Sequence, residues 1–188
     1  MNRVIYTDAT FEPLTLDEVK LQLKTDLDFT DEDNLYKSWI KAVRLHAENY
    51  LRMDLVQKTI DFYFDEFQDE MEIATYPIQS ITHVKYYDGN NTLQTLTANT
   101  DYIADTYNRV PRIEIINMPT TYDKYNAVNI RAVCGYSKQQ SIPENIKAGM
   151  LLLIAHFDQN REAVSDRQLY ELPFGVKNLW DLERIYQF

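Results

Sequence analysis

One cysteine and three histidines are the residues best suited to nucleophilic chemistry. Cys134 is the only cysteine, and the histidines are His46, His83 and His156. A cysteine activated by a neighbouring imidazole is a common nucleophile, so a Cys134–His pair would indicate a small hydrolase. The histidines fall on three different predicted elements, however, and Cys134 closes a predicted strand, where a lone cysteine usually packs as a small apolar residue. A hydrolase is therefore the last of the functions that we consider.

Acidic side chains form two clusters that could bind a metal or act as an acid–base pair. Segment 26–31 (DLDFTD) begins like a calcium loop, but Asp31 replaces the turn glycine and Lys37 replaces the bidentate carboxylate. We expect a solvated acidic loop there. The second cluster fits the charged face of an edge strand and its loop; it comprises Asp61, Asp65, Glu66, Asp69 and Glu70. We predict no catalytic residue, metal site or cofactor.

Composition and charge exclude several classes of protein. The chain has 188 residues, 45% of them hydrophobic, and 29 acidic against 19 basic side chains give a net charge of −10. Such a surface repels phosphate, so bulk binding of nucleic acid or an anionic membrane is not expected. The longest apolar run, 150–155, is far shorter than the ~20 residues of a membrane span. No signal peptide is evident, and we expect a soluble protein made in a reducing compartment.

Hydrophobic periodicity predicts an α+β fold with a helical-bundle core. Helices are expected near 15–25, 31–52, 143–160 and 176–186. Capping boxes are predicted at Thr15 with Glu18 and at Ser141 with Glu144. The second helix should bury an apolar stripe formed by Leu35, Trp39, Ala42, Val43, His46, Ala47 and Tyr50. Its polar face should carry Lys37, Lys41, Arg44, Glu48 and Arg52.

Between the second and third helices the period changes from 3.6 to two. We therefore predict an antiparallel β-rich module inserted near 57–136, with strands near 60–64, 81–87, 92–96, 112–116 and 128–134. This module is rich in tyrosine, whose ring offers amphipathic contact area for a peptide or carbohydrate. A binding module is therefore an alternative function, based on Tyr86, Tyr87, Tyr102, Tyr107, Tyr122 and Tyr125.

The C-terminal tail, 170–188, is unusually apolar and aromatic for a chain end. Its large side chains are Phe174, Val176, Leu179, Trp180, Leu182, Ile185, Tyr186 and Phe188. Such residues need cover. They can fold back on the chain's own core, or they can bury against another protein. The sequence leaves both alternatives open.

Three segments of the chain carry a resemblance to a known family. They are 14–23 (LTLDEVKLQL) with the acidic turn and the helix ending AENYLR at 47–52, then 142–148 (IPENIKA) running to 160–162, and 172–176 (LPFGV). This arrangement resembles the head–tail connector (head-completion adaptor) family of long-tailed bacteriophages and gene transfer agents. The similarity covers the helical half of the chain, and the β region matches only as the insertion that larger members carry.

The resemblance implies a structural virion protein without enzymatic activity. Residues 1–188 would form a single connector domain with the β-rich insertion at 57–136 and a C-terminal docking tail at 170–188. Copies would form a homo-oligomeric ring, a dodecamer on the portal, which binds after DNA packaging and provides the docking surface for a tail or stopper protein. DNA would pass through the channel without specific binding. The location would be the head–tail junction of the virion, with host cytoplasm during assembly, and the eight tail side chains would contact the portal.

Overall fold

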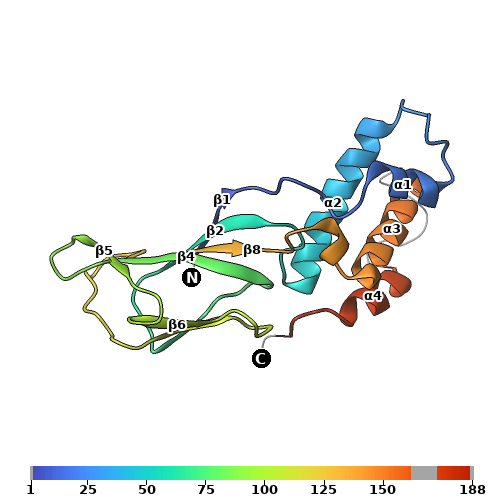
Figure 1. Cartoon of the computed structure of the whole chain (residues 1–188). Coiled ribbons are helices and arrows are strands. Elements are labelled where there is room, and N and C mark those ends of the chain that lie inside the picture. Colours follow the sequence, from blue (N-terminus) through green and yellow to red (C-terminus); the bar gives the residue numbers. More distant parts are fainter. Residues whose placement is uncertain (1, 162–172, 187–188) are drawn as a thin grey trace. The chain divides into compact units, whose positions relative to one another are not determined.

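A computed structural model describes residues 2–161 and 173–186 of the chain. The contacts divide the described residues into two compact units. The β unit contains residues 2–10 and 56–137, and the helical unit contains residues 11–55, 138–161 and 173–186. Figure 1 shows the elements of both units. The combination of helices with antiparallel sheets confirms the predicted α+β class.

The helical unit contains α1 (Leu16–Leu23), α2 (Asp33–Leu51), α3 (Glu144–Gln159) and α4 (Phe174–Asp181). The capping box that opens α1 is confirmed: the backbone N–H of Glu18 donates to Thr15 Oγ1 at 3.1 Å, and the Thr15 N–H donates to Glu18 Oε2 at 2.6 Å. The predicted box at Ser141 is wrong. Ser141 belongs to a 3-10 turn, Gln139–Ser141, and Pro143 is the residue that precedes α3. A proline favours extended backbone in the residue before it, so the helix begins only after Pro143.

The buried face of α2 differs from the predicted stripe. It consists of Tyr36, Ile40, Val43, Arg44, Ala47, Glu48 and Leu51. Leu35, Ala42 and His46, predicted to be buried, are exposed. Arg44 and Glu48, predicted to lie on the polar face, are buried, and Arg44 pairs there with both Glu48 and the distant Glu12. Each buried position of α2 therefore lies one residue later in the sequence than predicted. Charged side chains can occupy such positions because they have partners inside the fold.

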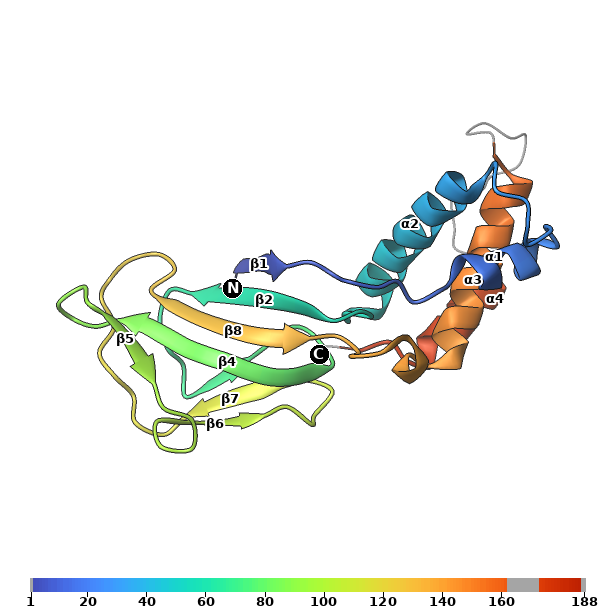
Figure 2. The same ribbon diagram turned by 45° about the horizontal axis from the view of Figure 1, so that its top comes forward.

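The β unit packs two antiparallel sheets over one core. The larger sheet has the order β1-β2-β8-β4-β5, and the smaller has the order β3-β7-β6; Figure 2 shows the strands of the larger sheet side by side. Their bounds are β1 Asn2–Thr7, β2 Lys58–Phe64, β3 Glu70–Glu72, β4 Ile78–Tyr87, β5 Leu93–Leu96, β6 Tyr102–Asp105, β7 Arg112–Ile115 and β8 Val128–Cys134. The shared core includes Phe62 and Ile130 from the larger sheet and Met71 and Ile113 from the smaller.

Three of these strands, β1, β3 and β6, were not predicted. All six residues of β1 are exposed, so the strand lacks the apolar–polar alternation that marks a half-buried strand. The strands β3 and β6 contain only three and four residues, too few for a period of two to stand out. The predicted strand near 81–87 is longer than expected, since β4 begins at Ile78.

Candidate functional site: the C-terminal docking surface

Trp180 anchors α4 on α3. Its side chain is completely buried, and its Nε1–H donates a hydrogen bond to the backbone carbonyl of Ile146 at 3.1 Å. The indole lies directly on Gly149, since a Cβ at that position would be 2.2 Å from Trp180 Nε1. Only a residue without a side chain allows this approach. Gly149 thus allows α4 to pack closely against α3.

Helix α4 also packs against α2. The Trp180 ring lies 5.8 Å from the Tyr50 ring and 6.1 Å from the His46 ring, centroid to centroid. Tyr50 Oη donates to Asp181 Oδ1 at 2.5 Å, and burial together with this carboxylate raises the pKa of Tyr50. Beyond the helix, the backbone N–H of Ile185 donates to the carbonyl of Leu51 at 3.0 Å. The tail is therefore attached to both long helices of its own unit.

These contacts divide the predicted docking residues into two groups. Val176, Trp180 and Ile185 are buried within the helical unit, and Leu179 is half-buried. By contrast, 78% of Phe174, 69% of Leu182 and 58% of Tyr186 is exposed. Phe188 lies outside the described residues. We call the exposed group, Phe174, Leu182 and Tyr186, the tail face.

Helix geometry explains this division. Val176 and Trp180 are four residues apart, so they share one side of α4. Phe174 and Leu182 are eight residues apart, a little over two turns, and share another side. The tail face therefore consists of exposed apolar side chains at the start of α4 (Phe174), directly after its end (Leu182) and farther along the chain (Tyr186). The buried side of α4 is packed into the core of the helical unit. The sequence left open whether this segment packs on the chain's own core or on another protein. These two alternatives concern different residues of the segment.

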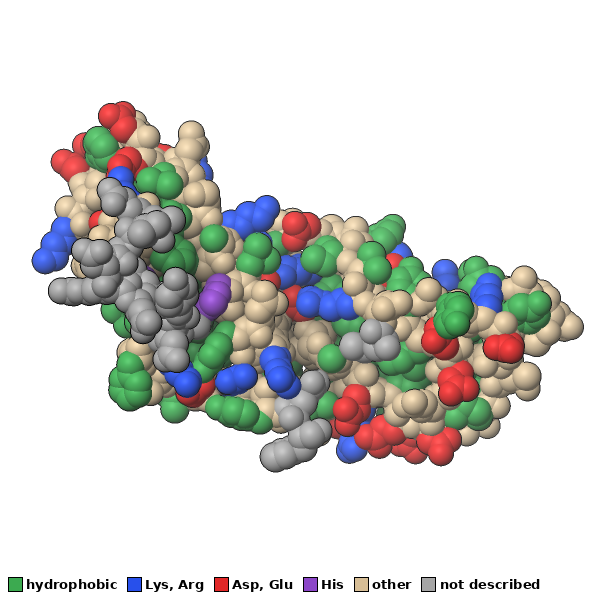
Figure 3. All heavy atoms as spheres, turned by 180° about the vertical axis from the view of Figure 1, so that it is seen from behind, with side chains coloured by type: hydrophobic (Ala, Val, Ile, Leu, Met, Phe, Trp, Pro, Cys, Tyr) green, Lys and Arg blue, Asp and Glu red, His purple; other side chains and the backbone are tan. Residues whose placement is uncertain are grey.

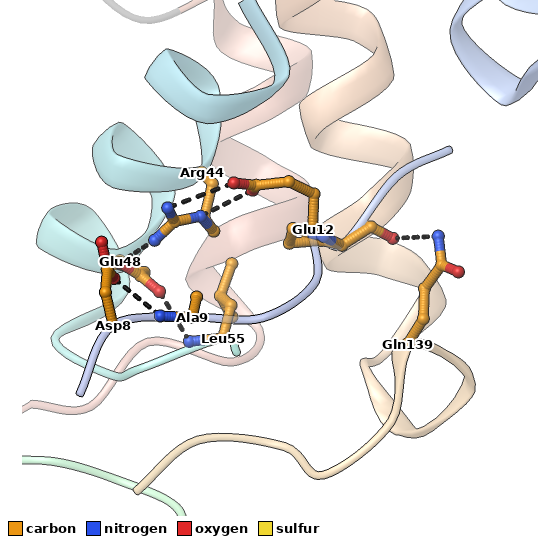
Figure 4. Close-up of polar contacts among 8 residues, drawn as sticks. Asp8, Ala9, Glu12, Arg44, Glu48, Leu55 and Gln139 are labelled. Atoms are coloured by element: carbon orange, nitrogen blue, oxygen red, sulfur yellow. Dashed lines mark hydrogen bonds and ion pairs between the residues drawn. The ribbon is translucent and has the colours of Figure 1, made fainter. Parts of the chain in front are cut away.

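Arg44 of α2 forms an ion-pair network with Glu12 and Glu48 (Figure 4). Arg44, of which 2% is exposed, donates from Nε and Nη2 to the two carboxylate oxygens of Glu12 at 2.7 and 3.3 Å. Its Nη1 donates to Glu48 Oε2 at 3.2 Å, and Glu48 Oε1 accepts the backbone N–H of Leu55 at 3.0 Å. A buried guanidinium with two carboxylate partners rigidifies the helix on which α4 rests.

The residues considered for nucleophilic chemistry have structural surroundings within the unit to which each belongs. Cys134 is fully buried at the end of β8, as expected for a small apolar residue. His83 is hydrogen bonded to Asn129 at 2.8 Å, the His46 ring lies tilted 6.1 Å from the Trp180 ring, and His156 lies on α3. Over residues 2–161 and 173–186, no group of three or more His, Cys, Asp or Glu side chains could hold a metal ion.

The clustered carboxylates have structural partners. Both carboxylate oxygens of Asp61 accept hydrogen bonds from Arg131 at 2.7 Å, and this hydrogen bonding lowers the pKa of Asp61. Asp65 accepts the backbone N–H of Asn126 at 2.7 Å. Glu70 pairs with Arg112 at 2.9 Å. These carboxylates hold strands and loops together. The predicted charged face of an edge strand is wrong for Asp61, which is buried on β2 between β1 and β8.

The six tyrosines of the β unit do not converge on one binding surface. Tyr102 is buried in the core, and Tyr86 packs edge-on against Phe67 at 5.4 Å. Tyr122 and Tyr125 line an open depression of about 560 Å³, but its other walls include Asp65, Glu66 and Asp123. Figure 3 shows acidic side chains gathered along one side of this unit.

In the described part of the chain, no helix has the length and apolar character needed to cross a bilayer.

Comparison with known proteins gave matches of structure only. No family model matches the sequence, and no curated protein matches it. A chain in the neck of an empty gene transfer agent particle, computed with C6 symmetry, shares the fold with a TM-score of 0.82 and 19% identity. Chains of a native gene transfer agent virion (0.81, 18%) and of a native neck computed with C12 symmetry (0.78, 17%) also match. Each match covers 100% of this chain and 97% of the other chain.

These matches confirm, at the level of the fold, the resemblance drawn from the helical segments of the sequence. They extend over the β unit as well, which the sequence resemblance accounted for only as an insertion. The C-terminal segment that carries the tail face lies within the matched length.

Proposed function

We propose that this chain is a structural subunit of the neck of a phage-like particle, acting as a head–tail connector and not as an enzyme. The observation that carries the proposal is the match of the whole chain, over both units, to chains from gene transfer agent necks and virions. In this role the protein resides at the head–tail junction of the virion and is present in the host cytoplasm during assembly.

The connector is a homo-oligomeric ring, a dodecamer on the portal. Neck structures computed with C6 and C12 symmetry support cyclic assembly of chains with this fold. The ring binds the portal after DNA packaging and offers its other side to a stopper or tail protein. A net charge of −10 suits a conduit for DNA, because like charges keep the polyanion from adhering to the wall.

The tail face is the part of the chain that meets the portal. Phe174, Leu182 and Tyr186 are large, apolar and exposed, a combination that usually marks a protein interface. Their backbone is fixed by the buried residues Val176, Trp180 and Ile185 of the same segment. A surface that is ordered before it binds loses less conformational entropy on binding. The buried residues of the predicted docking set thus act by holding the exposed ones in place.

The experiment compares two triple variants in binding to purified portal. Phe174→Ser, Leu182→Ser and Tyr186→Ser together should weaken binding at least tenfold, because apolar anchors dominate interface energy. The matched control changes the same residue types at exposed positions elsewhere, Phe29, Leu21 and Tyr107.

Both triple variants should keep the wild-type circular dichroism and unfolding midpoint, and the control should keep its portal affinity. Unchanged affinity of the tail-face variant would contradict the assignment of this surface. Deletion from Phe174 onward is a poor test, since it also removes the buried Trp180.

A further inference from the structure

The first strand of the chain lies at an open edge of the larger sheet. Among the described strands, β1 is the last on its side and pairs only with β2. All six of its residues are exposed, including 52% of Val4, 49% of Ile5 and 62% of Tyr6. An edge strand presents a row of backbone N–H and C=O groups that can pair with another strand. The side chains of β1 therefore have apolar surface on both faces beside a row of available backbone groups.

The opposite edge of the same sheet has a similar character. It is formed by β5, which pairs with β4 and is the last described strand on that side. Half of the Leu93 side chain is exposed, and β5 (LQTL) carries no charge. The only charge on β1 (NRVIYT) is that of Arg3. Neither edge has a lysine, proline or carboxylate, the residues by which proteins commonly prevent edge-to-edge pairing.

The smaller sheet shows what a protected edge looks like in this protein. Its outer strands are β3 and β6. The first carries Glu70 and Glu72, and the second carries Asp105. Between copies of a chain with a net charge of −10, carboxylates along an edge repel an approaching strand. Arg112 of β7 pairs with Glu70 and Asp105, but both outer strands of the smaller sheet still carry carboxylates, whereas β1 and β5 carry none.

Strand direction makes the two free edges complementary. Four successive antiparallel pairings separate β1 from β5, so these two strands run in the same direction. A rotation about an axis roughly along the strands preserves that direction, and it brings β5 of one copy beside β1 of the next in parallel. Such a contact is heterologous, the type that closes into a cyclic ring.

We propose that β1 of one copy pairs with β5 of the next copy, so that the five-stranded sheets continue around the ring. The occupant of each edge is thus a second copy of this chain. This inference rests on the proposed ring and specifies the surfaces through which its subunits meet.

Single lysine substitutions test the pairing. Ile5→Lys on β1 and Leu93→Lys on β5 place a charge on the free edges at exposed positions, so the fold should be retained. Ile103→Lys is the matched control: 50% of Ile103 is exposed, as with Ile5 and Leu93, but it lies on β6, an acidic edge. Analytical ultracentrifugation of the purified chains, at high concentration and with portal added, measures the association.

We expect each free-edge variant to associate at least tenfold more weakly than the wild type, and the control to form rings. A mixture of Ile5→Lys with Leu93→Lys retains one intact pair of edges, β5 of the first and β1 of the second. The mixture should therefore form heterodimers that grow no further, although each variant alone remains monomeric.

The outcomes separate this inference from the proposed function. If the wild type and both free-edge variants all form rings, the proposed strand pairing is wrong, but the connector function is unaffected. Loss of rings in Ile103→Lys to the same extent would overturn it as well, because the effect would then be one of charge alone. A wild-type chain that forms no ring, even with portal, would overturn both.

Discussion

Replacing Gly149 by alanine tests the contact that orders the C-terminal segment. In the interior of an exposed helix this substitution normally stabilises by about 1 kcal/mol, since alanine is the better helix former. At Gly149 the new Cβ would lie 2.2 Å from Trp180 Nε1 and 2.7 Å from Cδ1 of the same ring. To reach the ordinary contact distance of 3.4 Å, the indole must retreat by about 1 Å.

The retreat of the indole has two costs. The hydrogen bond from Nε1 to the Ile146 carbonyl, now 3.1 Å, would lengthen beyond bonding distance, which costs about 1–3 kcal/mol in a buried site. Strain and imperfect repacking around an added methyl group cost a further ~1–3 kcal/mol. After the helix-propensity gain is subtracted, we expect a net loss of about 1–5 kcal/mol in the free energy of unfolding. The sign is thus opposite to that expected for an unconstrained helix position.

Urea unfolding followed by circular dichroism and tryptophan fluorescence measures this change. Gly175→Ala is the control, because a Cβ there meets no atom within 4 Å, and it should be neutral or stabilise by up to ~1 kcal/mol. In a Trp180→Leu background, Gly149→Ala should lose most of its destabilising effect. A Gly149→Ala protein more stable than the wild type would refute the close approach of α3 and α4.

Two further predictions concern ion pairs. Arg44→Ala leaves the buried Glu48 without its guanidinium and should destabilise by about 3–5 kcal/mol in urea unfolding, whereas Arg112→Ala, in an exposed pair, should change little. Hydrogen bonds from Arg161 lower the pKa of Glu32 to about 2, so the ionised carboxylate stabilises the fold fully above pH 4.5 and loses this effect as the pH falls toward 2. In Arg161→Ala, an NMR titration should find the Glu32 pKa nearer 4.5, and the stability difference from the wild type should vanish at the acid end; an unmoved pKa would contradict the pair.

The sequence predicted the helices well because their signals are local. The period of 3.6 residues and the Thr15–Glu18 box lie within each helix, so no knowledge of the rest of the fold was needed. The buried side of α2 could not be predicted in the same way. Arg44 is buried because Glu12, 32 residues away, folds across it, and no local pattern indicates that partner. A charged residue was therefore placed on the solvent side by a rule that ignores distant ion pairs.

The same limit applies to the candidate site. Side-chain types predicted an apolar C-terminal segment but did not separate Trp180 from Phe174, which is equally aromatic. The separation depends on Gly149, which brings α3 close enough to enclose one ring and leaves the other exposed. The strand β1 was missed for a related reason, since its exposed residues show no pattern of burial. Residues whose environment is completed by a distant element or another chain carry little local signal.

The distribution of carboxylates indicates which surfaces of this acidic chain can meet another protein. Copies with a net charge of −10 repel one another over most of their surface, so association is favoured where exposed carboxylates are few. Two such regions stand out among the described residues: the free edges formed by β1 and β5, and the apolar side chains of the tail face. Scattered exposed apolar residues, such as Leu21, are ordinary on a protein surface and do not mark a contact by themselves. What distinguishes the two regions is that several exposed apolar side chains occur on one segment whose backbone is held by the fold: a strand paired with β2 in one case, and a segment anchored by Trp180 in the other. Charge thus restricts where neighbouring proteins can approach. The buried contacts beneath each surface fix the positions of the side chains that a neighbour would contact.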